Sequence, residues 1–261
     1  PRQLPDVAVQ ILSRRYGVGG SGLLLVAQGK KEKLRMLLYG PQGQELPSDG
    51  LALRCLSRYA FDSGLVTEES FRVEAGDSSA AVEVLDSHNI MTSSPAPRYF
   101  GGAQTLRERA GEDFTRTLKL GSRELRCTPL DVQGPQVVVF AQDYGLAFPE
   151  LAAQVDRAGA FPPETCYSLV RVVSRESLSL RAWNSGEGEM LASEPAACAG
   201  TAAAVLNGLT DRGVKVLLEG GNLLVDWAED DGRFYVSGAA DYVFMGTYYY
   251  DEGDADEDDE D

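Results

Sequence analysis

The sequence predicts an α+β fold, and three observations favour it. Segments of strand-like composition dominate the chain, and each half adds about two segments with helical periodicity. Hydrophobic residues make up 43 % of the 261 residues, enough to bury a core. That length allows one large domain or two of about 130 residues. The longest apolar run, 22–27, is far shorter than the roughly 18 residues that would suggest a membrane span, so we expect neither a span nor a secretory leader.

The first half is expected to hold two helices and two pairs of strands. Apolar residues recur at helical spacing over 6–15, and a second helix over 53–62 ends at Gly64. The turn-forming residues of 92–97 predict an exposed loop. The expected strands lie at 23–27, 34–39, 71–74 and 81–85.

The second half is expected to add two more helices among a larger number of strands. One helix covers 149–158 and starts at a proline, and the other is the small-residue segment 195–209. The expected strands lie at 114–120, 124–132, 136–141, 167–173, 177–183, 214–219, 223–227, 234–236 and 242–245.

The two halves repeat at an offset of 144 residues. Segment 34–46 lies on segment 178–190 without a gap, so that the strand-end aromatics Tyr39 and Trp183 coincide. We therefore expect two pseudo-symmetric units, 1–115 (joined by a last strand at 242–250) and 116–241, followed by an acidic disordered tail at 251–261. Facing halves would bring two helix N-termini to a central cleft, with Asp49 and Ser193 as equivalent positions.

Charge and rare residues exclude several functions. The net charge is −16, but the last eleven residues hold nine carboxylates, and without them 31 acids face 24 bases, a net charge of −7. Such a balance argues against nucleic-acid binding. A single histidine argues against His-based triads and multi-histidine metal sites, so we expect no metal site. Four cysteines without CxxC spacing indicate reduced thiols and a cytoplasmic protein.

Several separated segments resemble the diaminopimelate epimerases. Residues 14–19 (RRYGVG) are similar to the family's R-x-[FHL]-G-[IV]-G, and 35–45 (RMLLYGPQGQE) to R-M-x-[IL]-F-N-x-D-G-S-E. Segment 183–198 resembles W-E-R-G-x-G-E-T-x-A-C-G-[ST]-G-A-C. The resemblance implies two pseudo-symmetric domains, each a sheet wrapped round a central helix, with a cofactor-independent site between them. Since that family often forms dimers, a homodimer is implied by resemblance alone.

The same alignment implies that the chemistry of the family has been lost. Its two catalytic thiols, which act on opposite faces of the substrate's α-carbon, fall on Asp49 and Ser193. Its substrate-gripping Glu-Arg pair falls on Asn184 and Ser185, and Glu194 brings a negative charge to the helix N-terminus where a carboxylate would dock. We take Asn184, Ser185 and Glu194 as candidates for lining the cleft, with Asp49 and Ser193 as candidate catalytic residues.

Three functions stay open at this point. The favoured one is a catalytically silent epimerase-like protein, a pseudoenzyme, that acts as a binding or scaffold module. The acidic tail 251–261 would then be either a solubilising segment or a docking site for a basic protein partner. The alternative is a cofactor-independent isomerase with Asp49 as acid/base, similar to the phenazine-biosynthesis isomerases. The least favoured is an active diaminopimelate epimerase of lysine biosynthesis.

Overall fold

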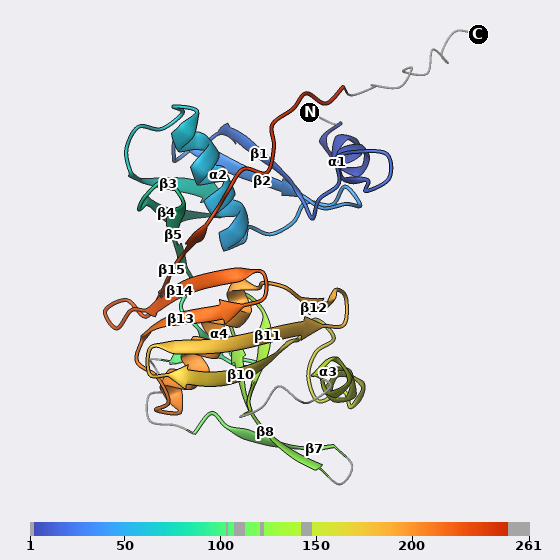
Figure 1. The fold of residues 1–261 in the computed structure, drawn as a ribbon, viewed down its shortest axis with the longest axis vertical. Helices are drawn as coiled ribbons and strands as arrows, with labels where there is room; N and C mark the ends of the chain where they lie inside the picture. Colours follow the sequence, from blue (N-terminus) through green and yellow to red (C-terminus); the bar gives the residue numbers. More distant parts are fainter. Residues whose placement is uncertain (1–2, 103, 107–112, 121–122, 142–147, 250–261) are drawn as a thin grey trace, which may run out of the picture.

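The strands form one mixed sheet that runs through the whole molecule. The structure is a computed structural model, and it describes residues 3–102, 104–106, 113–120, 123–141 and 148–249. Within these residues the strands follow the order β1-β2-β3-β4-β5-β15-β14-β13-β11-β10-β9-β8-β6, with β12 beside β11 and β7 beside β8. The antiparallel pairing of β5 with β15 joins the two parts of the sheet, so backbone hydrogen bonds run across the junction (Figure 1).

The first part of the sheet wraps round helix α2 (Gly50–Asp62). Helix α1 (Leu4–Leu12) precedes it. Strands β2 and β3 are parallel, and a parallel pair needs a crossover connection, which α2 provides. The strands of this part are β1 (Leu23–Gln28), β2 (Leu34–Tyr39), β3 (Ser70–Ala75), β4 (Ser78–Val84) and β5 (Asn89–Ser94). The short β6 (Arg98–Tyr99) follows in the chain but pairs with β8 of the second part.

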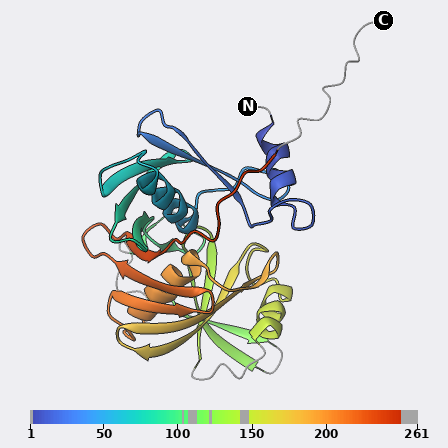
Figure 2. The same cartoon turned by 45° about the horizontal axis from the view of Figure 1, so that its top comes forward.

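In the second part, the elements from α3 to β15 follow the order of α1 to β5 round helix α4 (Glu194–Leu206), with β12 added and with β7 to β9 ahead of them. Helix α3 (Phe148–Arg157) precedes it, and α4 connects the parallel strands β11 and β13. The strands are β7 (Arg116–Leu120), β8 (Arg123–Asp131), β9 (Pro135–Phe140), β10 (Cys166–Ser174), β11 (Ser177–Asn184), β12 (Gly188–Met190), β13 (Gly213–Leu218), β14 (Gly221–Trp227) and β15 (Phe234–Ala239). The fold thus has the two pseudo-symmetric halves that the sequence predicted (Figure 2).

Each central helix buries a core of its own. Leu53 and Leu56 of α2 pack with apolar residues of β2 to β5. Helix α4 is apolar all round, as a helix enclosed by a sheet has to be, and its alanines 196, 197, 199 and 202–204 are fully buried. Small side chains let the surrounding strands approach the helix closely, and Gly200 leaves only 2.8 Å between the position of an added Cβ and Leu180 Cδ1.

One expectation about the strands is wrong and another is wrong in part. Residues 92–97 were expected to form an exposed loop, but only 95–97 lie outside the strands, and Thr92 and Ser94 are buried within β5, at the junction of the two parts of the sheet. The loop was expected because serines favour turns. In the structure, buried and half-buried residues alternate along β5, which is the pattern of a strand. A strand was also expected at 242–245, and the structure has none there.

The segment after β15 runs along the first part of the molecule without joining the sheet. Tyr242 interacts through its hydroxyl with Asp62 of α2, whereas Val243 and Met245 are 94 % and 87 % exposed. The expected tail, 251–261, lies outside the described residues. Among the helices that the structure describes, none is long and apolar enough to cross a membrane.

Truncation of Leu56 should destabilise the first core strongly. Leu56 is fully buried, and Leu→Ala changes at such sites cost about 2–5 kcal/mol through lost burial and the cavity left behind. Leu51→Ala is the matched control, because Leu51 belongs to the same helix and is 55 % exposed. Denaturant unfolding of both variants measures the difference, and equal losses would contradict the assigned core.

Candidate functional site

Asp49 is the N-cap of α2. Its backbone is extended, and its Oδ1 accepts a hydrogen bond of 2.6 Å from the backbone N–H of Ala52. This is the ordinary role of an aspartate at a helix start, where it satisfies a backbone donor that lacks a partner within the helix. The side chain is exposed and lies beside the cleft between the two halves.

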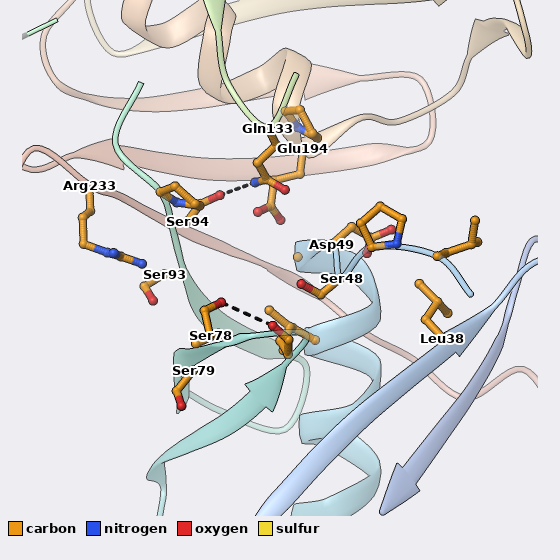
Figure 3. A pocket seen from close by; sticks show the side chains of 18 residues that line it. Leu38, Ser48, Asp49, Ser78, Ser79, Ser93, Ser94, Gln133, Glu194 and Arg233 are labelled. Carbon is orange, nitrogen blue, oxygen red and sulfur yellow. Dashed lines mark hydrogen bonds between the residues drawn. The ribbon is translucent and has the colours of Figure 1, made fainter. Parts of the chain in front are cut away.

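Ser193 has the equivalent role at α4. Its Oγ accepts a hydrogen bond of 3.3 Å from the backbone N–H of Ala196, and its backbone is also extended. Pro195, which follows in the first turn, has no backbone N–H to offer to a ligand. Asp49 and Ser193 are thus the caps of two helices whose N-termini meet in the centre of the molecule (Figure 3).

A buried ion pair joins these two helices. Arg54 Nη1 lies 2.5 Å from Glu194 Oε2, and the side chains are 3 % and 4 % exposed. The residues are 140 positions apart in the chain, one on each central helix. Removing both charges from water is expensive, so the pair depends on close geometry. Arg54 Nε has no hydrogen-bond partner among the described residues.

The Glu194 carboxylate also rests against the first residue of α2. A Cβ added to Gly50 would lie 1.8 Å from Glu194 Oε2, so no other residue type fits at this position without displacing the carboxylate. The N-terminus of a helix carries about half a positive charge, which favours an anion. Glu194 therefore occupies, with a side chain of the protein itself, a position suited to the carboxylate of a ligand.

Burial raises the pKa of Glu194, and the nearby Asp49 adds to this effect. The Arg54 guanidinium opposes it by attraction and by its hydrogen bond. Arg54 is thus the cation that favours the charged carboxylate, against desolvation and the negative charge of Asp49.

Two cavities flank the ion pair, and both are lined by Asp49, Glu194 and Pro195. The first, here called the serine cavity, has a volume of about 500 Å³ and lies against the first half (Figure 3). Its polar lining includes Ser48, Ser78, Ser79, Ser93, Ser94 and Arg233. The second cavity, of about 350 Å³, lies against the second half and is also lined by Leu51, Arg54 and Ser193.

Asn184 is the last residue of β11, and Ser185 begins the turn to β12. Asn184 Oδ1 accepts from the backbone N–H of Glu187 at 2.7 Å, and Ser185 Oγ donates to the carbonyl of Pro163 at 2.9 Å. Neither residue lines the two cavities, whereas Glu194 lines both.

Three residues of the site were not predicted from the sequence: Arg54, Gln133 and Arg233. For Arg54 the one available signal was an arginine within the apolar pattern of α2.

No cysteine lines either cavity, and three of the four thiols are too buried to ionise readily. Burial raises the pKa of Cys127 to about 11 and that of Cys166 to about 12, and it raises the pKa of the fully buried Cys198 as well. These thiols stay protonated at neutral pH, and a thiol has to ionise to act as a nucleophile or base. Among the described residues no group of three or more His, Cys, Asp or Glu side chains could hold a metal ion.

Removal of the Arg54 charge should destabilise the protein by about 3–5 kcal/mol, the usual loss when one partner of a buried pair is left alone. In Arg54→Met, Glu194 has no cation, and its raised pKa makes the protonated acid the better buried form. Stability from such a group is fully present below its unfolded pKa of about 4.3 and is lost as pH rises through the folded pKa. The loss in Arg54→Met should therefore shrink as pH falls, which unfolding measured across pH will test.

The control is the double variant Arg54→Met/Glu194→Met, which replaces the pair by apolar side chains of similar size. Such replacements are often neutral or stabilising, so this variant should recover most of the stability of the unaltered chain. A double variant as unstable as Arg54→Met at every pH would contradict the assignment of the loss to an unpaired carboxylate.

Several solved structures have a similar fold but little sequence identity to this chain. A probable proline racemase from Agrobacterium radiobacter K84 has a TM-score of 0.64 at 11 % identity, covering 98 % of this chain and 83 % of that one. A putative phenazine biosynthesis protein from Clostridium difficile has a TM-score of 0.62 at 11 % identity, covering 95 % and 88 %. At such identities the likeness shows the fold alone.

Sequence similarity gives the family. No family model matches the chain. A diaminopimelate epimerase from Desulfitobacterium hafniense is 33 % identical over 267 aligned residues, which cover 96 % of this chain and 91 % of that protein. Together with the fold and the two helix N-termini that meet at the cleft, this likeness over nearly the whole chain establishes that the protein belongs to the diaminopimelate epimerase family.

Proposed function

We propose that this chain is a catalytically silent member of its family that acts as a binding or scaffold module. The observation that carries the proposal is the Arg54–Glu194 ion pair. Its carboxylate lies against Gly50 at the start of α2 and takes the place that an incoming carboxylate would need. A substrate that bound at the helix N-termini would have to displace a buried, paired charge.

The two positions that align with the catalytic thiols support the same proposal. Asp49 and Ser193 both accept hydrogen bonds from their own helices. Capping a helix is a structural role, and it accounts for both residues without any part in catalysis. A carboxylate has an ordinary pKa of about 3.9 against about 8.5 for a thiol, and it is the weaker base toward an α-proton. Neither a serine hydroxyl nor a capping carboxylate offers the pair of exchangeable thiol protons that the family's reaction requires.

A cofactor-independent isomerase with Asp49 as acid/base is the second candidate. Its support is that Asp49 is exposed and lines both cavities, so the carboxylate is within reach of a ligand in either one. Such an enzyme would act on a more acidic proton than the α-proton of an amino acid, because Asp49 is a weak base.

Incubation with diaminopimelate in D₂O should give no exchange of the α-hydrogen for deuterium. Proton NMR measures the exchange, and the Desulfitobacterium hafniense relative serves as the positive control. Exchange by this chain would contradict the silent proposal. Such exchange would instead support an active diaminopimelate epimerase, and its loss in Asp49→Asn, which keeps a capping oxygen but removes the carboxylate, would identify Asp49 as the base.

The C-terminal region suggests how a binding module would engage a protein partner, and we propose a basic one. Val243, Phe244, Met245 and Tyr249 are exposed apolar or aromatic side chains within seven residues, and contiguous apolar surface of this kind marks interaction sites. The nine carboxylates of 251–261 follow directly in the chain. Apolar contact beside a run of acids suits a partner segment that carries both apolar and Lys or Arg side chains.

A labelled oligolysine peptide should bind the full chain and lose about tenfold or more in affinity when residues 251–261 are removed, because most of the attraction is electrostatic. Fluorescence polarisation at low and high salt measures this, and binding should weaken as salt is added. The matched control keeps the tail's length but carries Asn and Gln in place of its acids. Equal binding by the full and shortened chains would contradict a docking role for the tail.

A further inference from the structure

We propose that the serine cavity binds a small polyhydroxylated carboxylate, of the sugar-acid class. The inference rests on the proposed function, since it treats the cleft as a binding site without chemistry. It starts from a cavity of about 500 Å³ between the two halves, a size within the range of small-molecule sites in proteins.

One end of the serine cavity carries a cation, Arg233. It is half-buried, directly precedes β15 and extends toward Ser93 (Figure 3). It forms no salt bridge within the part of the chain that the structure describes. Asp231 attracts the guanidinium, but its carboxylate accepts hydrogen bonds from the Arg233 backbone N–H and from the Tyr235 hydroxyl. A guanidinium in this state can bind a carboxylate through two parallel hydrogen bonds.

Hydroxyl groups from three separate segments line the middle of the cavity. Ser48 precedes α2, Ser78 and Ser79 begin β4, and Ser93 and Ser94 end β5. Ser93 Oγ accepts from the backbone N–H of Ala81, and Ser94 Oγ accepts from Gln133 Nε2. A hydroxyl that accepts one bond still has its own proton to donate, so both serines can bind a ligand hydroxyl.

The far end offers carboxylate oxygens that can accept hydrogen bonds from ligand hydroxyls. Asp49 Oδ1 accepts from the start of α2, and Glu194 is paired with Arg54. Asp49 is exposed and keeps its second carboxylate oxygen for a ligand hydroxyl. The carboxylate of a ligand is therefore directed to the Arg233 end of the cavity, and its hydroxyl groups are directed to this end.

The count of charges points to a single negative charge on the ligand. Arg233 is the cation among the described residues that line the serine cavity, and Arg54 lines the second cavity instead. A monocarboxylate matches one guanidinium, while a phosphate ester carrying about two charges would be left partly unpaired beside Asp49 and Glu194. The serines and the two carboxylates then bind the hydroxyl groups of the chain.

Isothermal titration with D-gluconate tests the proposal, with D-glucose and diaminopimelate as comparison ligands. We expect gluconate to bind, and glucose, which lacks the carboxylate, to bind about tenfold more weakly or not at all. Arg233→Gln should weaken gluconate binding by a similar factor without changing the weak binding of glucose. Arg175→Gln is the matched control, because Arg175 is exposed and pairs with Asp211 away from the cavity. The unfolding temperature of each variant verifies that it is folded.

Equal affinity for gluconate and glucose, equal loss in both arginine variants, or no gluconate binding by the unaltered chain would overturn the ligand class. Tighter binding of diaminopimelate than of gluconate would overturn it as well. The same samples in D₂O, followed by NMR, report on the proposed function separately. Exchange of a carbon-bound hydrogen in any ligand would contradict a silent cleft, whereas absent gluconate binding without exchange contradicts only the sugar-acid assignment.

Discussion

The meeting of two helix N-termini in the centre of the molecule is the constraint on which the rest of the structure depends. Each N-terminus carries partial positive charge and backbone donors that lack partners. Two such ends that face each other repel unless an anion lies between them, and here the anion is Glu194. Arg54 then balances the carboxylate, and Gly50 must stay without a side chain so that the carboxylate fits. One requirement of the fold thus determines three residues.

That solution changes what the cleft can do. Because this anion is a side chain of the protein, it stabilises the cleft when no ligand is bound. A ligand carboxylate at the same place would have to displace Glu194 and leave Arg54 without its partner. The capping bonds of Asp49 and Ser193 work in the same direction, because each engages a side chain that would otherwise be available for proton transfer. The same contacts that stabilise the ligand-free state therefore occupy the helix ends where a ligand carboxylate would bind.

Local patterns predicted most of the helices and strands but not the contact that joins the two halves. The helix expected over 53–62 begins three residues earlier, at Gly50, because Asp49 caps it, and the helix expected from 195 begins at Glu194 after the cap Ser193. The parallel strand pairs follow from the helices that connect them. The strand β5 was missed because its serines are turn formers in isolation, and their place depends on pairing with β15, some 140 residues later in the chain. The Arg54–Glu194 pair could not be predicted for the same reason, since only the tertiary fold brings its partners together.

The pseudo-symmetry of the fold explains why there are two cavities, and its breakdown explains why they differ. With the halves superposed by element order, Ser48 and Ala192 precede the two central helices, and Ser78 and Ser79 at the start of β4 correspond to Gly221 and Asn222 at the start of β14. The backbone provides the same hollow twice, but only the first keeps the row of hydroxyls. The two cavities thus differ in side chains at equivalent positions, while the residues at the two helix N-termini join the halves through the Arg54–Glu194 pair.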